Sequence, residues 1–438
     1  MSRLPLDGTP SVIGVDVGRE ARDIDFGVLL REWREGVRMT QLELATMSTV
    51  SIRAIRNLEL GLARNPRRET VRLLADALRL SGWRRAALQL AAGHTADDDT
   101  FAMSMPRHSP VNRSLVGREN EVARLAALVA GSAHPIIRIT GIGGVGKTRL
   151  ARAVADGLRA ERGIACLWMS LASEADGDPA YAVWTDALVE AVPRAIESLC
   201  DLIGGRSVLL IIDGDDDRRI AHDALARLVR ACPNLRTITT SRQPAKDDSH
   251  QVPLWPLPTA CPPGSDLSPA ARLLLTLVDP ADGTFILTTD TCGRLTRICE
   301  LLDGIPRSIE SAAAWFRLSS TEEIAAIARN EPLTLTAVPA RPSTGSWVYD
   351  AVWDATGSLP ERQRAMLEAS IRLEQPWSLG ELTRHTGSSY LEAASALHEF
   401  TVRGVVAPTG GDGVRFSTLN LVRAVWPCLA HGKRHGTV

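Results

Sequence analysis

The stretch GIGGVGKT, residues 141–148, has the residue types and spacing of a loop that cradles phosphate groups. It fits the pattern G-x-x-x-x-G-K-[ST], and it contains one of only three lysines among 438 residues. Its glycines allow positive φ angles, so that backbone N–H groups and the start of the next helix can face the phosphates. We expect Lys147 to reach the β- and γ-phosphate oxygens of a nucleotide, and Thr148 to bind Mg²⁺.

Two apolar segments downstream end in polar residues that suit the same chemistry. SVLLIID delivers Asp213, a second candidate ligand for Mg²⁺. LRTITTSR delivers Arg242, which could contact a γ-phosphate and so distinguish a triphosphate from a diphosphate; a plain surface arginine is the alternative. We expect the acidic residues at positions 215–217 to cap the next helix.

These residues need strands that end at one edge of a sheet. Between residues 116 and 251, the apolar segments PIIRIT, GIACLWMSL, SVLLIID and LRTITTS alternate with helical patterns. Such alternation indicates βαβ units and a parallel sheet whose carboxyl ends carry the ligand site. Helical patterns continue to residue 330, and residues 347–426 show helices followed by two short strands around a Gly-rich turn.

Residues 26–85 have a chemistry of their own, because they carry twelve arginines against six acidic residues. The net charge of the whole chain is -1, so this local excess of +6 indicates an anionic partner. Thr40 and Ser51 are expected to cap two short helices that begin at Gln41 and Ile52.

This spacing resembles the helix-turn-helix of the lambda-repressor or XRE type. The resemblance implies that the third helix enters the major groove of double-stranded DNA, where Arg53 or Arg56 can pair with guanine edges. The predicted DNA-binding residues are Thr40, Gln41, Ser51, Ile52, Arg53, Arg56 and Asn57. Thr49 stands where this turn usually carries glycine, so we expect a strained left-handed residue there. A helical bundle that contacts protein is the alternative.

A series of motifs along the chain resembles the STAND-class NTPases of the NB-ARC type. The motifs are LVGRENEVARL, GIGGVGKT, LLIIDGD, TTSR and LLDGIPRSIESAAAW, in this order. The resemblance implies that residues 116–118 line the adenine and ribose, that Pro306 approaches the nucleotide from a helical lid, and that ADP is exchanged for ATP on activation. The predicted nucleotide-binding residues are Val116, Gly117, Arg118, Gly141, Gly143, Gly144, Val145, Gly146, Lys147, Thr148, Arg149 and Pro306, with Asp213 and Arg242 as catalytic residues and Thr148 and Asp213 as metal ligands.

The resemblance thus implies a multidomain chain with an all-α helix-turn-helix head, an α/β P-loop NTPase with a parallel sheet, a helical lid and a C-terminal winged helix. The expected segments are a leader at 1–25, the helix-turn-helix domain at 26–92, a linker at 93–114, the NTPase domain at 115–262, the lid at 263–330, a linker at 331–346 and the winged helix at 347–438.

Two positions depart from the family pattern. Gly214 follows Asp213 where the family commonly has an acidic or amide residue that acts on the attacking water, so hydrolysis depends on whether Asp215 takes over. Leu419 and Asn420 stand where a His-Asp pair often senses the diphosphate. Both departures favour at most a slow ATPase that acts as a switch, because a sensor does not need an efficient general base.

The composition is that of a globular chain, with 45% hydrophobic residues, and the seven cysteines show no C-x-x-C pair. We read no signal peptide and no membrane span, and expect a cytoplasmic protein without a membrane partner. The leading hypothesis is a transcription regulator switched by ATP/ADP and Mg²⁺ that forms homo-oligomers on activation. The alternatives are a signalling or defence ATPase whose N-terminal helices bind protein, and a small-molecule kinase that uses the same P-loop.

Overall fold

The computed structural model describes residues 26–63, 65–80, 115–131, 133–171, 206–215, 222–244, 249–262, 267–278, 288–339, 347–409 and 414–430, together with positions 85, 88–89, 91–92, 94, 200, 203 and 264–265. The chain divides into two compact units, with the main boundary between residues 103 and 104. The predicted leader at 1–25 and nearly all of the predicted linker at 93–114 lie outside the described residues.

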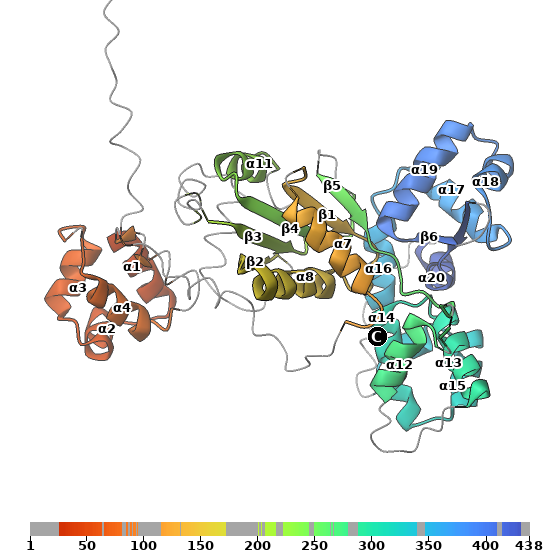
Figure 1. Ribbon diagram of the computed structural model, residues 1–438, viewed down its shortest axis with the longest axis horizontal. Coiled ribbons are helices and arrows are strands. Elements are labelled where there is room, and N and C mark those ends of the chain that lie inside the picture. The colour runs from red at the N-terminus through yellow and green to blue at the C-terminus, as the bar shows by residue number, and fades with distance from the viewer. Residues whose placement is uncertain are drawn as a thin grey trace, which may run out of the picture. The chain divides into compact units, whose positions relative to one another are not determined.

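The N-terminal unit is built from helices α1 (Phe26–Gly36), α2 (Gln41–Ser48), α3 (Ile52–Glu59) and α4 (Arg68–Ala77) (Figure 1). Its core is apolar, and Leu30, Leu44, Ile55 and Leu74 are fully buried in it. The predicted start of α2 is confirmed, because the Thr40 hydroxyl accepts from the Glu43 amide while the Glu43 side chain accepts from the Thr40 amide. Ser51 caps α3 in the same way, by accepting from the amide of Ala54.

The turn between α2 and α3 contains a residue in the left-handed conformation. Thr49 has φ 58° and ψ 13°, which confirms the predicted left-handed residue. Helix α1 then crosses α3 closely at Gly27, where a Cβ atom would collide with the carbonyl oxygen of Leu58. A residue with any side chain at position 27 would therefore push α1 away from α3.

The second unit contains a five-stranded parallel sheet in the order β2-β3-β4-β1-β5. Its strands are β1 (Ile136–Thr140), β2 (Ala165–Ser170), β3 (Val208–Asp213), β4 (Leu235–Ser241) and β5 (His250–Pro253). Helices α7 (Glu119–Ala130), α8 (Lys147–Arg162) and α11 (His222–Ala231) accompany the sheet. The predicted parallel sheet is confirmed, and its register brings the carboxyl ends of β1, β3 and β4 to one edge.

The segment predicted as a helical lid contains α12 (Pro269–Val278), α13 (Thr289–Leu301), α14 (Pro306–Ala313) and α15 (Thr321–Asn330), with one short 3₁₀ turn, η3 (Ala314–Arg317). These helices share a core of their own, in which Leu274, Leu295 and Ile309 are fully buried. We refer to residues 267–339 as the lid.

The predicted linker at 331–346 is wrong over its first half. Residues 331–339 pack on the helices of the lid, and they include the 3₁₀ turn η4 (Thr334–Thr336), in which Leu335 is fully buried. The indole N–H groups of Trp315 and Trp347 donate to the carbonyl oxygens of Ala337 and Thr336. The Pro- and Thr-rich composition concealed this contact, because a short segment can pack through one apolar side chain without any periodic pattern.

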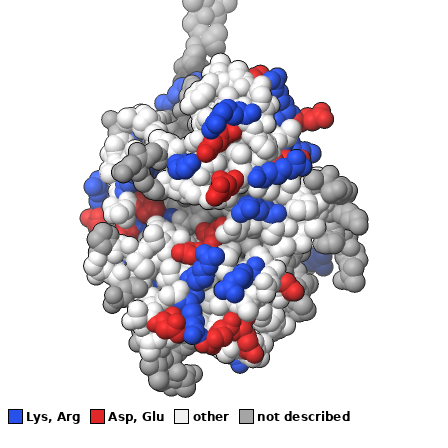
Figure 2. All heavy atoms as spheres, turned by 90° about the vertical axis from the view of Figure 1, so that its right-hand side faces the viewer, with Lys and Arg blue, Asp and Glu red and all other residues white. Residues whose placement is uncertain are grey.

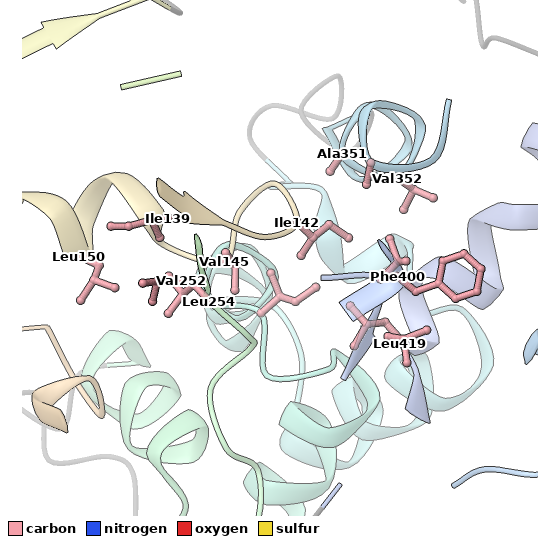
Figure 3. Close-up of a cluster of buried hydrophobic side chains, with 14 of the residues drawn as sticks. Ile139, Ile142, Val145, Leu150, Val252, Leu254, Ala351, Val352, Phe400 and Leu419 are labelled. Atoms are coloured by element: carbon pink, nitrogen blue, oxygen red, sulfur yellow. The ribbon is translucent and has the colours of Figure 1, made fainter. Parts of the chain in front are cut away.

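The C-terminal segment contains α16 (Trp347–Thr356), α17 (Glu361–Arg372), α18 (Leu379–Thr386), α19 (Tyr390–Arg403), the antiparallel strands β6 (Val406–Thr409) and β7 (Arg415–Thr418), and α20 (Asn420–Ala430). The expected helices and the two strands are present, and we call residues 347–430 the C-terminal module. Its core is continuous with that of the sheet, as Figure 3 shows for Ile142 beside Ala351, Val352 and Phe400.

No helix in the described part of the chain is long and apolar enough to cross a membrane.

We predict that Gly27→Ala destabilises the N-terminal unit by about 1–3 kcal/mol, because the new methyl group overlaps the Leu58 carbonyl. Hydrogen exchange of the full chain should show faster exchange of the α1 and α3 amides. Val28→Ala is the matched control, since the Val28 side chain is half exposed and its removal leaves that contact intact. Unchanged exchange in α3 of the Gly27 variant would contradict the prediction.

Candidate nucleotide site and helix-turn-helix face

The phosphate loop joins β1 to α8, as the sequence predicted. Gly146 is the N-terminal cap of α8, with φ 103°, and Gly144 has φ 82°, so both adopt backbone conformations that favour glycine. A Cβ atom at Gly141 would lie 2.5 Å from the carbonyl oxygen of Leu254. Nζ of Lys147 donates to the carbonyl oxygens of Gly141 at 2.7 Å and Ile142 at 3.1 Å, which places the ammonium group against the loop.

The two predicted metal ligands lie side by side at the sheet edge. The Thr148 hydroxyl donates to Oδ1 of Asp213 at 2.7 Å, and the Thr240 hydroxyl on β4 donates to the same oxygen at 2.6 Å. The Thr240 hydroxyl itself accepts from the amide of Gly214 at 3.0 Å. A hydroxyl and a carboxylate at one point are oxygen ligands of the kind that Mg²⁺ prefers, so this pair fits the ion. Sequence reasoning missed Thr240, whose part depends on the pairing of β3 with β4.

Asp215 does not cap the next helix, and that prediction is wrong. Its side chain is buried and forms an ion pair with Nη1 of Arg138 on β1 at 3.0 Å. The Asp215 amide donates to the carbonyl oxygen of Thr240, so the chain after β3 continues along β4, and the carboxylate is buried against Arg138 of β1. Removing one partner of such a buried pair typically costs about 3–5 kcal/mol. Positions 216 and 217 lie outside the described residues.

Arg242 reaches the phosphate loop from the end of β4. Its Nε lies 3.9 Å from the place where a Cβ atom on Gly143 would stand. Its guanidinium forms an ion pair with Asp354 on α16, with about a third of each side chain exposed. The position agrees with the prediction that Arg242 lies near a terminal phosphate, and its contact with phosphate stays a prediction.

The residues predicted to line the adenine and ribose side lie at the start of α7. Gly117 has φ 69°, and a Cβ atom there would lie 2.6 Å from Cβ of Pro269 in the lid. Arg118 is buried and donates to the carbonyl oxygen of Trp255 at 2.6 Å and to Glu121 at 2.8 Å. Burial, partly offset by Glu121, lowers the pKa of Arg118. Arg118 therefore connects the segment after β5 to α7 through hydrogen bonds. Val116 packs against the apolar core of the lid.

The lid touches the phosphate loop through the first turn of α14. Pro306 occupies the first position of that helix and is buried. The amide of Arg307 donates to the carbonyl oxygen of Gly144 at 3.2 Å. Arg149 on α8 forms an ion pair with Glu310 on α14. Val145 is fully buried in the sheet core, so it supports the loop from below.

Asp303, which the sequence did not single out, connects the lid to the C-terminal module. It lies in the turn before α14, and its two carboxylate oxygens accept from the amides of Asn420 at 2.7 Å and Leu421 at 2.8 Å, at the start of α20. The Asn420 side chain donates to the carbonyl of Glu300 at 3.1 Å. Burial raises the pKa of Asp303 to about 7, against these hydrogen bonds and the charge of Arg423. Asn420 is thus an anchor for the lid.

In the N-terminal unit, the exposed face of α3 carries three of the predicted DNA-binding residues. Ile52, Arg53 and Arg56 are exposed, while Asn57 is half-buried. The capping residues Thr40 and Ser51 are exposed at the starts of α2 and α3. The positions of these residues agree with the predicted face.

A buried hydrogen-bonded network in this unit corrects the simple charge count. Arg34 is buried, and its Nε donates to Glu59 at 2.6 Å, so its charge is neutralised inside the unit. The Gln41 amide also donates to Glu59 at 2.6 Å and is held against α3. Other arginines pair with acids on the surface, as Arg72 does with Glu69. The positive charge that can attract an anionic partner is therefore carried by exposed arginines such as those on α3.

The sequence comparisons agree with this division of the chain. A family described as AAA ATPase domain matches residues 114–338, just over half of the chain. The chain belongs to the AAA ATPase domain family. A second family, described as helix-turn-helix, matches residues 30–82, which confirms the predicted helix-turn-helix ahead of the AAA domain.

Two curated relatives from Mycobacterium tuberculosis are similar over part of this chain. One, provisionally named an HTH-type transcriptional regulator, is 31% identical over 192 residues, which cover 43% of this chain and 21% of the relative. The other is an uncharacterized protein, 30% identical over 217 residues, which cover 49% of this chain and 53% of the relative. The chain therefore spans between about a fifth and about half of the length of these relatives.

Among solved structures, the chain is similar to a STAND protein with a tetratricopeptide repeat sensor from Pyrococcus horikoshii, with a TM-score of 0.30 and 15% identity over 72% of this chain and 44% of that chain. It is also similar to AMPPCP-bound DnaA from Aquifex aeolicus, with a TM-score of 0.33 and 17% identity over 64% of this chain and 87% of that chain. The family assignment rests on the sequence match.

We predict that Asp303 makes the stability of the AAA domain with its C-terminal module depend on pH. An unfolded aspartate ionises near 3.8 and the folded one near 7, so the folded state binds the proton more tightly. The contribution of Asp303 is present below about pH 4 and is lost as pH rises to about 7. Thermal unfolding of the wild type and of Asp303→Asn should therefore differ more in favour of the wild type at about pH 5 than at about pH 8.

Glu368→Gln on the surface of α17 is the control for this measurement, because that residue pairs with Arg372 at the surface. A difference between wild type and Asp303→Asn that stays constant over this range would contradict the prediction.

Proposed function

We propose that this chain is a DNA-binding transcriptional regulator of the STAND class, with an AAA domain of the NB-ARC type that switches between ADP and ATP. The observation that carries the proposal is the presence, in one chain, of a helix-turn-helix unit with two exposed arginines on α3 and a phosphate loop whose Thr148 meets Asp213 at 2.7 Å. In this proposal the C-terminal module is a winged helix that closes over the nucleotide, and exchange for ATP drives homo-oligomer formation.

In the nucleotide site, the backbone of the loop and Lys147 hold the β- and γ-phosphates. Thr148 and Asp213 hold Mg²⁺, which neutralises charge on the phosphate oxygens. Thr240 orients Asp213 through its hydrogen bond from β4. Val116, Gly117 and Arg118 form the adenine and ribose side, and Pro306 brings the lid over the nucleotide.

The same site supports slow hydrolysis at most. Gly214 offers no side chain to a water, and the Asp215 carboxylate is buried against Arg138. A general base must come within hydrogen-bond reach of the attacking water, and in this proposal a carboxylate held in a buried ion pair does not. In this proposal ATP therefore stays bound without rapid hydrolysis, so that the ADP-bound and ATP-bound forms can act as the two states of a switch.

DNA binding in this proposal belongs to the N-terminal unit. Its α3 presents Arg53 and Arg56 for base edges and phosphates, and the capped starts of α2 and α3 suit phosphate groups. The α18–α19 pair of the C-terminal module is less suited, because the start of α19 presents Tyr390, Leu391 and Glu392. Figure 2 shows basic and acidic side chains interspersed on the face of the C-terminal module and lid.

One observation favours the second candidate, a signalling or defence ATPase whose N-terminal unit binds protein. Seven large apolar side chains in the described part of this unit are exposed: Val28, Val37, Leu42, Met47, Ile52, Leu60 and Leu62. A contiguous patch of exposed apolar side chains often marks a site where another protein binds. DNA affinity distinguishes this candidate from the regulator.

We predict that Arg53→Ala combined with Arg56→Ala lowers the affinity of the full chain for duplex DNA at least tenfold and makes it less dependent on salt, because a protein with fewer arginines on the phosphates releases fewer counterions when it binds. Fluorescence anisotropy with a random duplex over a range of salt concentrations measures both. Arg31→Ala combined with Arg72→Ala removes the same charge from two exposed arginines that pair with Glu35 and Glu69. An equal decrease in DNA affinity in both double variants would show that the effect comes from net charge alone. If the wild type binds no DNA at any salt concentration, the second candidate is favoured.

We also predict that Lys147→Ala abolishes binding of ADP and ATP and leaves binding of the duplex measurable, because the phosphate loop and α3 lie in separate units. Calorimetry with Mg-ADP and Mg-ATP reports the first, and anisotropy the second. Lys246→Ala is the control, as it removes a lysine outside the loop. Retention of nucleotide in Lys147→Ala would exclude this loop as the binding site.

A further inference from the structure

Helix α16 lies against the tip of the phosphate loop. A Cβ atom on Gly143 would lie 2.8 Å from Cβ of Ala351, and one on Gly144 would lie 2.7 Å from the ring of Trp347. Figure 3 shows Ala351 and Val352 of this helix facing Ile142 of the loop. The helix is thus packed on the loop by apolar contacts, at the point where the terminal phosphate of a nucleotide would approach.

The same helix carries two acidic residues one turn apart. Asp350 and Asp354 are four positions apart, so they lie on the same side of α16. Asp354 forms an ion pair with Arg242 at the end of β4. This pair crosses from the AAA sheet to the C-terminal module, and it uses the arginine that could contact a terminal phosphate.

A second arginine stands beside this pair. The Arg307 guanidinium at the start of α14 lies 4.7 Å from the centre of the Trp347 ring. Burial lowers the pKa of Arg307 most, the charge of Arg242 lowers it further, and Glu310 and Asp350 raise it. Arg242 and Arg307 are therefore close enough to repel each other. Arg242, through its ion pair with Asp354, and Arg307, through its contact with the Trp347 ring, thus place two positive charges beside α16.

We propose that Asp354 takes the place of a terminal phosphate on Arg242, with Asp350 adding negative charge on the same side of α16, so that α16 and the γ-phosphate of a triphosphate compete for this arginine. The proposal rests on the proposed nucleotide-switching function and adds the residues that set the switch. A diphosphate lacks the third phosphate and leaves the ion pair of Arg242 with Asp354 intact. A triphosphate brings an anion that can accept two parallel hydrogen bonds from a guanidinium, as a carboxylate does.

The exposure of the pair makes exchange feasible. About a third of each side chain is exposed, and ion pairs at that level of exposure are weak. Competition then favours the partner with more charge, since a γ-phosphate also interacts with Lys147 and Mg²⁺. Displacing Asp354 loosens α16 on the loop, and with it the module that α20 and Asp303 tie to the lid.

The test is the affinity of the full chain for Mg-AMPPCP and for Mg-ADP, measured by calorimetry. Asp354→Asn should strengthen AMPPCP binding about tenfold, within the usual range for coupling between two sites, and change ADP binding less than about twofold. Asp350→Asn should act in the same direction and less. The apolar contacts of Trp347, Ala351 and Val352 remain in both variants, so the helix keeps its packing. Glu368→Gln on α17 removes the same charge at a distance and should change neither affinity.

A double-variant cycle tests the competition itself. In an Arg242→Ala background, Asp354→Asn should no longer strengthen AMPPCP binding, because the contested arginine is absent. Hydrogen exchange of α16 in the wild type should accelerate with Mg-AMPPCP and stay unchanged with Mg-ADP.

Several outcomes separate this proposal from the proposed function. If Asp354→Asn raises the affinities for AMPPCP and ADP equally, or raises neither, α16 does not discriminate between the two nucleotides. That result excludes the competition and leaves the proposed nucleotide binding intact. If the gain persists in the Arg242→Ala background, Asp354 acts through another group. If the wild type binds neither nucleotide, the proposed function fails, and this inference with it.

Discussion

The close approach between the phosphate loop and the C-terminal module constrains the whole second unit. The loop glycines are commonly explained by the phosphates they cradle, and here they also leave room for protein. Gly143 and Gly144 admit α16, while Gly404, after α19, lies so close to the loop that a Cβ atom there would stand 2.7 Å from the Ile142 amide nitrogen. A change of backbone at the loop therefore has to move the module, because close-packed groups cannot deform gradually.

Charged contacts surround this apolar contact and decide how it responds. Arg242 with Asp354 links the sheet edge to α16, and Arg149 with Glu310 links α8 to the lid. Asp303 ties the lid to the start of α20 by accepting two backbone hydrogen bonds. The first two pairs are partly exposed and weak, whereas Asp303 is buried. Such a combination suits a movable module on a lid that stays attached to it.

The fold places the Asp215 carboxylate where it cannot act on a water at the nucleotide site. Its carboxylate follows Asp213 by two positions, which from the sequence alone could place it near the reacting water. The pairing of Arg138 on β1 with Asp215 beyond β3, across β4, buries it in the structure instead. An acid so placed supports the sheet edge, and Asp213 is left as the carboxylate at the predicted metal position.

The local features of this protein follow from the order of its residues. Glycines at fixed spacing, a lysine and a threonine predict the phosphate loop, and Thr40 and Ser51 predict the starts of α2 and α3, because capping and turn formation involve residues within a few positions of each other. Alternation of apolar segments with helical patterns predicts the strands and helices of the α/β sheet, because the period of each element is a local property of the sequence. The contacts between side chains across the sheet, and between the lid and the C-terminal module, become visible only once the chain is folded. The partners named above for Thr240, Asp215, Asp303 and Asp354 lie between 25 and 118 positions away along the chain, and their contacts depend on strand order and helix packing. No local sequence pattern predicts the strand order or the helix packing. The burial that makes an ion pair or a hydrogen bond important arises only when distant segments pack together.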